Sequence, residues 1–179
     1  QFLGYWGYGL SLELNSIIAK VTRNKNTKLL NFHQGETVCG VSYIGGENLP
    51  ITRGDSLIAA LSASGFSDSI DAWVKVKNNQ LILGREPFGR VPLYWGRIEQ
   101  IIWFASELKL LLCVIPKPSI SIPGFYGYTC FSYVPTPLTP VENIFAIPPG
   151  VEHFFSDPKT YTQQRYEWRE NSIPVSYTH

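Results

Sequence analysis

The sequence is poor in charged residues, and the charges that it has almost cancel. Charged side chains make up 16% of the 179 residues and the formal net charge is +1, whereas a typical soluble domain has a charged share of about 25%. A balanced charge leaves no electrostatic footprint for nucleic acid or an anionic membrane. Because 14% of the residues are aromatic, we expect an exposed apolar surface that a partner chain or a further domain covers.

Cysteine is scarce as well. The three cysteines, Cys39, Cys113 and Cys130, are odd in number and lack the spacing of a disulfide framework. No cysteine or histidine lies two to four residues from another, so the sequence predicts no metal site. We expect buried free thiols in a reducing cytosol, and therefore a cytoplasmic location.

Long apolar runs are missing too. No run approaches the roughly 20 residues that a membrane-spanning helix needs, and no basic segment precedes Phe2-Leu3 as it would in a signal peptide. These absences predict a soluble protein without a membrane partner. A chain of 179 residues suits one domain that buries its own core.

Short β-rich runs separated by turn residues dominate what is there. They predict strands over residues 2–10, 16–22, 29–32, 38–44, 72–76, 80–84, 91–95 and 101–105, and helices over 55–61, 108–112 and 121–131. Residues 135–140 are expected to form a rigid extended connection. Blocks of strands separated by helices favour an α+β fold with mostly antiparallel sheets over a parallel βαβ arrangement.

The most specific stretch is residues 81–109. An apolar run ends at Gly84, Arg85-Glu86-Pro87-Phe88-Gly89 supplies a turn, Pro92-Leu93-Tyr94 follows, and Ala105-Ser106-Glu107-Leu108-Lys109 comes after a hairpin. This order resembles the type 2 glutamine amidotransferase domain, of the N-terminal nucleophile class, in glutamine-hydrolysing asparagine synthase-like proteins. The likeness continues through residues 127–128, 134–137 and 147–150. It is strong over residues 70–155 and poor over residues 1–50.

The resemblance implies a four-layer αββα sandwich, in which two mostly antiparallel sheets lie between helical layers. Residues 1–168 would form this domain and residues 169–179 a linker or tail, with the synthetase domain absent from the chain. ATP and magnesium are expected only in that missing synthetase domain, so no cofactor is predicted for this chain.

The chemistry that the resemblance implies needs an N-terminal cysteine. Its thiolate attacks the side-chain amide of glutamine, while its own amino group acts as the base. The nearest match to the family's Cys-Gly-Ile-x-Gly opening is Leu3-Gly4-Tyr5-Trp6-Gly7, which puts Leu3 at the nucleophile position. Leucine offers neither a nucleophile nor a proton acceptor, so no catalytic residue is predicted. Cys39 lies too near Arg85 for Cys39-Gly40 to serve as a processed start.

The family's substrate clamp consists of an early arginine, an Asn-Gly-Glu segment and an aspartate. The resemblance assigns substrate binding to Asp71, which would pair with the ammonium group of glutamine, and to Glu47 in the distant echo Ile44-Gly45-Gly46-Glu47. A structural role at a strand end is an equal alternative for Asp71. The asparagine that helps to hold an oxyanion is absent. Arg85 and Glu86 are interpreted as fixing the turn beside them.

The leading hypothesis is a degenerate domain that no longer hydrolyses glutamine. It would serve as a structural or docking domain for an ATP-dependent, amide-forming synthetase domain in the same chain or on a partner. Two alternatives stay open: an active glutamine-hydrolysing domain that supplies ammonia for asparagine synthesis, and a peptide-recognition module of a peptide-cyclising asparagine synthase homologue. Whether the chain is an enzyme is therefore undecided, and glutamine or a peptide is its candidate ligand.

Overall fold

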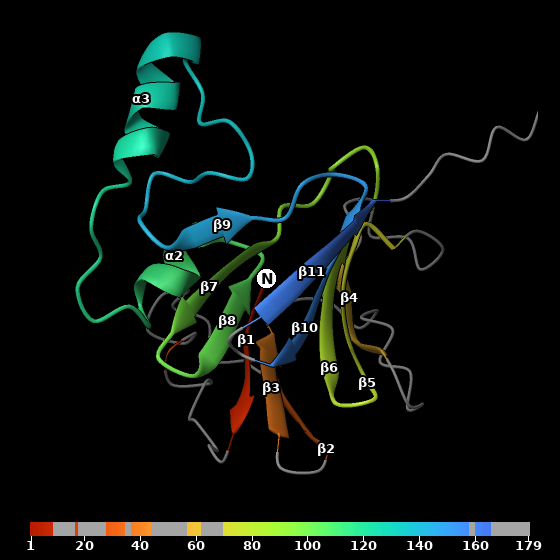
Figure 1. Ribbon diagram of the computed structural model, residues 1–179. Helices are drawn as coiled ribbons and strands as arrows, with labels where there is room; N and C mark the ends of the chain where they lie inside the picture. Colours follow the sequence, from red (N-terminus) through yellow and green to blue (C-terminus); the bar gives the residue numbers. More distant parts are fainter. Residues whose placement is uncertain are drawn as a thin grey trace, which may run out of the picture.

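Two antiparallel sheets form the body of the protein (Figure 1). The computed structural model describes residues 1–8, 17, 28–34, 37–43, 57–61, 70–157 and 160–165. The first sheet has the order β2-β3-β1-β8-β7-β9. Its strands are β1 (Phe2–Tyr8), β2 (Lys28–Gln34), β3 (Thr37–Tyr43), β7 (Tyr94–Ile98), β8 (Ile101–Ala105) and β9 (Ile144–Ala146).

The second sheet has the order β11-β10-β6-β5-β4. Its strands are β4 (Leu57–Leu61), β5 (Ala72–Lys77), β6 (Gln80–Arg85), β10 (Val151–Asp157) and β11 (Thr160–Arg165). Two helices accompany the sheets, α2 (Leu108–Leu112) and α3 (Ile122–Phe131). Antiparallel sheets with few helices are compatible with the α+β class predicted from the sequence.

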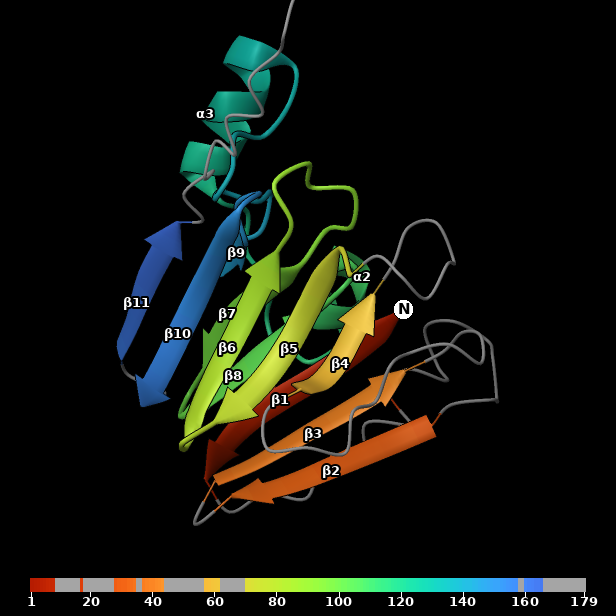
Figure 2. The same ribbon diagram turned by 90° about the vertical axis from the view of Figure 1, so that its right-hand side faces the viewer.

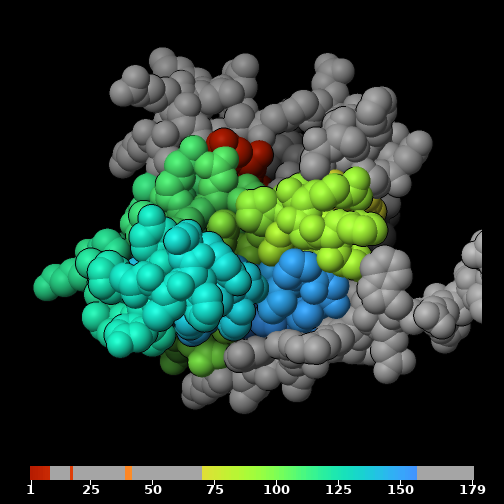
Figure 3. Space-filling model, turned by 90° about the horizontal axis from the view of Figure 1, so that it is seen from above, coloured from red at the N-terminus to blue at the C-terminus, as the bar shows by residue number. Residues whose placement is uncertain are grey.

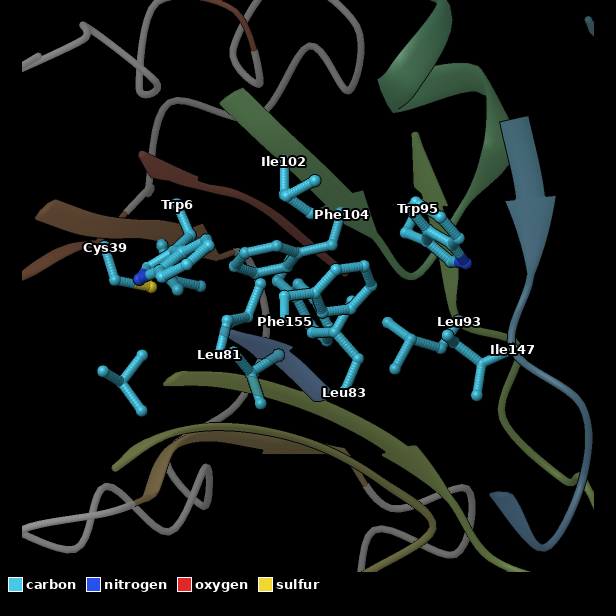
Figure 4. Packing of buried hydrophobic residues seen from close by; sticks show 14 of the residues in the cluster. Trp6, Cys39, Leu81, Leu83, Leu93, Trp95, Ile102, Phe104, Ile147 and Phe155 are labelled. Atoms are coloured by element: carbon cyan, nitrogen blue, oxygen red, sulfur yellow. The ribbon is translucent and has the colours of Figure 1, made fainter. Parts of the chain in front are cut away.

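The core lies between the two sheets (Figure 4). Side chains alternate across a strand, and in β1 this alternation sends Phe2 and Trp6 into the core. Leu81 and Leu83 of β6 meet them from the other sheet. The core is completed by further buried apolar residues, among them Leu93, Trp95, Ile102, Phe104, Ile147 and Phe155.

The first sheet also buries its outer face. The residues of β1 between the core positions, Leu3 and Tyr5, join Trp103 of β8 in a second apolar cluster. Helix α2 covers this cluster with Leu110 and Leu111. Because β1 has strands on both sides and apolar partners on both faces, it is an interior element of the fold.

Most predicted elements are confirmed, with shifts of a few residues at their ends. The prediction of a helix over residues 55–61 is wrong, since Leu57–Leu61 form β4, which pairs with β5. Ile17 is helical, although it lies inside the run 16–22 that we predicted as a strand; the rest of that run lies outside the described residues. The strand predicted over 91–95 begins later and ends later, as β7, because Arg97 and Ile98 still pair with β8.

Helix α3 begins where the sequence predicts. The Ser121 side chain caps it by accepting a hydrogen bond from the Gly124 amide at 3.1 Å, and Pro123 lies in the first turn. The helix projects from the sandwich in both ribbon views (Figures 1 and 2). The following segment, predicted as extended, instead turns at the cis Thr136–Pro137 bond, where the Leu138 amide binds the Pro135 carbonyl.

None of the helices in the described ranges is both long and apolar enough to cross a membrane.

Close approach of backbones in the first sheet generates a stability prediction. A Cβ atom on Gly4 would overlap the Phe104 ring and lie 2.9 Å from the Gly40 carbonyl oxygen. Gly4→Ala should therefore lower the free energy of unfolding by about 2–3 kcal/mol, since a packed core does not yield easily to an added methyl group. Urea denaturation midpoints measure the change.

Gly7→Ala is the matched control on the same strand. Its Cβ atom would lie 3.0 Å from the Gln100 carbonyl oxygen, at a less crowded position. A cost for Gly4→Ala equal to or below that of Gly7→Ala would contradict the packing described for β1.

Candidate functional site

Leu3, at the position that the resemblance gives to the nucleophile, is a core residue. Its Cα pairs with Ser42 of β3 on one side and Ala105 of β8 on the other. The side chain is fully buried in the cluster that α2 covers. Burying a leucine stabilises a fold by about 1.5–3 kcal/mol, so this position contributes packing energy and offers no reactive group.

The start of β1, the strand that contains Leu3, is hydrogen-bonded to the junction between β8 and α2. The Phe2 amide donates a hydrogen bond to Ser106 Oγ at 3.0 Å, and the Ser106 amide donates to the Phe2 carbonyl at 3.2 Å. The residue before the helix is Glu107, which makes no side-chain cap, while Ser106 fixes the start of β1. No local sequence signal marks this pairing, because its partners are 104 residues apart.

A buried arginine holds the segment that joins the two sheets, which we call the crossover loop (residues 86–93). Arg85, the last residue of β6, donates from Nε to the Val91 carbonyl at 2.7 Å and from Nη2 to the Gly89 carbonyl at 2.6 Å. Its Nη1 donates to the Ile147 carbonyl at 2.7 Å, in the turn between β9 and β10. The planar guanidinium thus fixes three backbone points at once.

Glu86 holds the same loop by accepting hydrogen bonds from backbone amides. The Phe88 amide donates to Glu86 Oε2 at 2.5 Å and the Arg90 amide to Oε1 at 2.6 Å. The Gly89 and Gly150 amides both donate to the Glu86 carbonyl at 3.1 Å. Gly89 has φ +64°, a conformation that glycine adopts without steric cost. The interpretation of Arg85 and Glu86 as residues that fix the turn agrees with this geometry.

The charge state of Glu86 follows from these contacts. Burial raises the pKa of its carboxyl, but hydrogen bonds from the Arg90 and Phe88 amides and the charges of Arg90 and Arg85 outweigh burial. The net result is a pKa below the ordinary value. Glu86 is therefore ionised at neutral pH and accepts all of these hydrogen bonds as a carboxylate.

Asp71, predicted to bind substrate, immediately precedes β5 and is completely buried. Its Oδ1 atom is 2.6 Å from Nη2 of Arg90, and its carbonyl accepts the Glu86 amide at 2.9 Å. β1 and β5 start at the same end of the sandwich (Figure 2), but Leu3 and Asp71 belong to different sheets. Glu47 lies outside the described residues, so the predicted pair cannot be assembled.

The three cysteines differ in exposure, and only Cys113 and Cys130 carry accessible thiols. Cys39 is buried in the core between the sheets, and burial raises the pKa of its thiol above the ordinary value, which keeps it protonated and unreactive. Cys113 and Cys130 are free and exposed. The prediction of three buried thiols is therefore correct for Cys39 and wrong for the other two.

A small open cavity of about 210 Å³ lies beside the crossover loop. Arg85, Tyr94, Leu108, Thr136 and Thr139 are among the residues that line it. This volume is below the roughly 300–1,000 Å³ of typical ligand pockets. Among the residues that the structure describes, no three His, Cys, Asp or Glu side chains gather as a metal site would require.

Comparison with known proteins identifies the family of the chain. Residues 70–167 match the family described as "Glutamine amidotransferase domain", and the chain belongs to this family. The matched range contains the crossover loop and begins at Ile70, so β1 and Leu3 lie outside it.

The chain is also similar to a curated protein, the asparagine synthetase [glutamine-hydrolyzing] 1 of Bacillus subtilis (strain 168). The two are 31% identical over 100 residues, a stretch that covers 55% of this chain and 16% of the relative. The matched stretch is thus about a sixth of that protein's length. The resemblance noted from the sequence is confirmed at the level of the amidotransferase domain.

The contacts of Glu86 generate a prediction with a defined pH dependence. Glu86→Gln should lower the free energy of unfolding at pH 7 by about 2 kcal/mol, because hydrogen bonds to a charged acceptor are replaced by weaker ones. The pKa of Glu86 is lowered on folding, so its contribution is present above the unfolded value and disappears as pH falls through the folded value. The difference between wild type and variant should therefore shrink below pH 4.5.

Chemical denaturation at a series of pH values measures this difference. Glu99→Gln, at an exposed position in the turn between β7 and β8, is the matched control and should change stability little at any pH. A difference between wild type and Glu86→Gln that stays constant from pH 7 to strongly acid pH would contradict the assignment.

Proposed function

We propose that this chain is an asparagine synthase-related amidotransferase domain that does not hydrolyse glutamine. It would act as a structural or docking domain for an ATP-dependent, amide-forming synthetase domain, in the same protein or on a partner. The observation that carries the proposal is the burial of Leu3 inside a closed apolar cluster. A leucine side chain there can neither attack an amide nor accept a proton.

The surroundings of Leu3 support the proposal. Leu3 is preceded by two residues, so its nitrogen is a peptide amide and cannot act as the base that the family's cysteine amine provides. Cys39, the cysteine on the neighbouring strand, pairs with Trp6 and is buried in the core. Any substrate would have to open the sandwich to reach its thiol.

The contacts of Asp71 favour a structural role for this residue over substrate binding. Its buried carboxylate forms a salt bridge with the Arg90 guanidinium at 2.6 Å. The ammonium group of glutamine would have to displace that guanidinium, which would leave two cations competing for one carboxylate. We infer that Asp71 now anchors the crossover loop, and Glu47 stays a candidate for ligand contact.

We also infer the layer arrangement of the fold, the cellular compartment and the place of the cofactors. Two facing antiparallel sheets with α2 on the outer face of one are compatible with the αββα sandwich of the N-terminal nucleophile class. The free exposed thiols of Cys113 and Cys130 favour a reducing compartment such as the cytoplasm. ATP and magnesium would then belong to the synthetase domain.

Release of ammonia from L-glutamine tests the proposal. The 179-residue chain should release no more ammonia than a reaction without protein, before and after treatment with a thiol alkylator. Cys39→Ser should leave the result unchanged and serves as the matched control for the buried thiol.

The opposite outcome is equally clear. Ammonia release that the alkylator abolishes would overturn the proposal. If that release survives in a Cys113→Ser/Cys130→Ser variant and is lost in Cys39→Ser, the core thiol is the nucleophile and the alternative of an active glutamine-hydrolysing domain holds.

A further inference from the structure

The small cavity beside the crossover loop carries a positive charge. Of the described residues that line it, Arg85 is the only charged one. Tyr94, Thr136 and Thr139 contribute side chains with hydroxyl groups, and the rest of the lining is apolar. Figure 3 looks onto this end of the molecule, where the yellow-green crossover loop lies beside the cyan segment that contains residues 134–140. A cavity with apolar walls and charge of one sign attracts ions of the opposite sign, so the lining favours an anion.

The Arg85 guanidinium is buried without a carboxylate partner in the described part of the chain. The two acidic side chains of the same region, Asp71 and Glu86, form their ion pairs with Arg90. Burial lowers the pKa of the Arg85 side chain below its ordinary value, although Tyr94 and Glu86 act in the opposite direction. Buried charges in proteins are usually paired. An anion in the cavity would give this cation a partner.

Arg85 also keeps donors in reserve. A guanidinium has five N–H donors, and three of them bind the carbonyls of Gly89, Val91 and Ile147. The other two belong to Nη1 and Nη2. Tyr94, which lines the same cavity, has a hydroxyl to which no described residue hydrogen-bonds. A planar guanidinium with N–H groups to spare and a neighbouring hydroxyl suit a carboxylate as the acceptor.

The size and the walls of the cavity narrow the class of ligand further. Its volume is about 210 Å³. Since a water molecule takes up about 30 Å³ in the liquid, a molecule of roughly four to seven non-hydrogen atoms fits. Leu108, Val134 and Leu138 offer apolar surface for a short hydrocarbon tail. An ammonium group beside the carboxylate would find no acidic side chain among the described lining residues, so the site disfavours amino acids.

The walls of the cavity are held in place by hydrogen bonds of their own. The Ala146 amide donates to the Pro137 carbonyl at 2.9 Å, and the Thr139 hydroxyl donates to the Ile144 carbonyl at 2.9 Å. Both bonds join the segment of residues 134–140 to β9. The cavity is therefore largely preformed, which lowers the entropy cost of ordering it around a ligand.

We propose that this cavity binds a short-chain monocarboxylate. The remaining Nη N–H groups of Arg85 and the Tyr94 hydroxyl hold its carboxylate, and its apolar tail lies against Leu108 and Leu138. Such a ligand differs from glutamine, which is larger and carries an ammonium group. Binding requires no hydrolysis of glutamine, so this proposal is independent of the function proposed above.

Three compounds of equal size separate the effects of charge and shape. Isobutyrate carries the carboxylate and an apolar tail, isobutyramide is its neutral counterpart, and L-alanine replaces one methyl group of isobutyrate by an ammonium group. Each is added to the isotope-labelled 179-residue chain at neutral pH and constant ionic strength, while amide signals are followed by NMR. A series from about 0.1 to 50 mM covers the affinity expected of so small a ligand.

The proposal predicts that isobutyrate shifts the amide signals of lining residues such as Leu108 and Ala146 until they saturate. Isobutyramide and L-alanine should bind at least about tenfold more weakly, because one lacks the charge and the other buries an unpaired ammonium group. Tyr94→Phe should weaken the binding of isobutyrate about fivefold through the lost hydrogen bond. Tyr126→Phe, at an exposed tyrosine on α3, is the matched control and should bind like the wild type.

The absence of saturable shifts with isobutyrate would overturn the proposal. Equal binding of isobutyramide would do the same, since the cavity would then recognise shape without charge. Binding of L-alanine or inorganic phosphate as tight as that of isobutyrate would contradict the ligand class. Unchanged affinity in a folded Tyr94→Phe chain, checked by its urea midpoint, would contradict the assigned contacts. The three-compound comparison uses the wild type, so it is decisive even if the variant does not fold.

Discussion

The hydrogen bonds of the Arg85 guanidinium hold together the two sheets and the turn between β9 and β10. Two of its carbonyl partners, Gly89 and Val91, lie in the crossover loop, where the chain turns. The third, Ile147, is 62 residues away in sequence. Glu86 then fixes the amides of the same loop. These bonds give the carbonyls of Gly89 and Val91 and the amides of Phe88 and Arg90 hydrogen-bond partners within the protein. This arrangement lies wholly inside the range matched by the family.

Local signals in the sequence were sufficient where structure is decided locally. Pro87 and Gly89 predict the crossover turn, and the β-rich runs of β1, β5 and β6 predict strands, because φ preferences and side-chain propensities act within a few residues. They failed at β4. Leu57-Ile58-Ala59-Ala60-Leu61 consists largely of good helix formers without alternation, and its strand conformation depends on pairing with β5. Such pairing overrides local propensity and cannot be seen in a short window.

In the candidate site, too, the sequence predicts what depends on single residues and not what depends on tertiary pairing. The sequence identifies which chemistry Leu3 lacks, since that depends only on the side chain. It does not identify the face of β1 on which Leu3 lies, because the register with β3 and β8 decides this. Nor does it identify Ser106 as the anchor of β1, or Arg90 as the partner of Asp71. Leu3, at the position that the resemblance gives to the nucleophile, is part of the buried core in this chain.

Amide hydrogen exchange at Phe88 and Arg90 tests the central claim most directly. Both residues are exposed and lie in a loop, and the hydrogen bonds that their amides donate to the Glu86 carboxylate should protect these amides from exchange. The account predicts that these amides exchange as slowly as those of β6, because the loop opens only when the whole domain unfolds. Fast exchange at both amides while β6 stays protected would show that the crossover loop opens on its own and does not hold the two sheets.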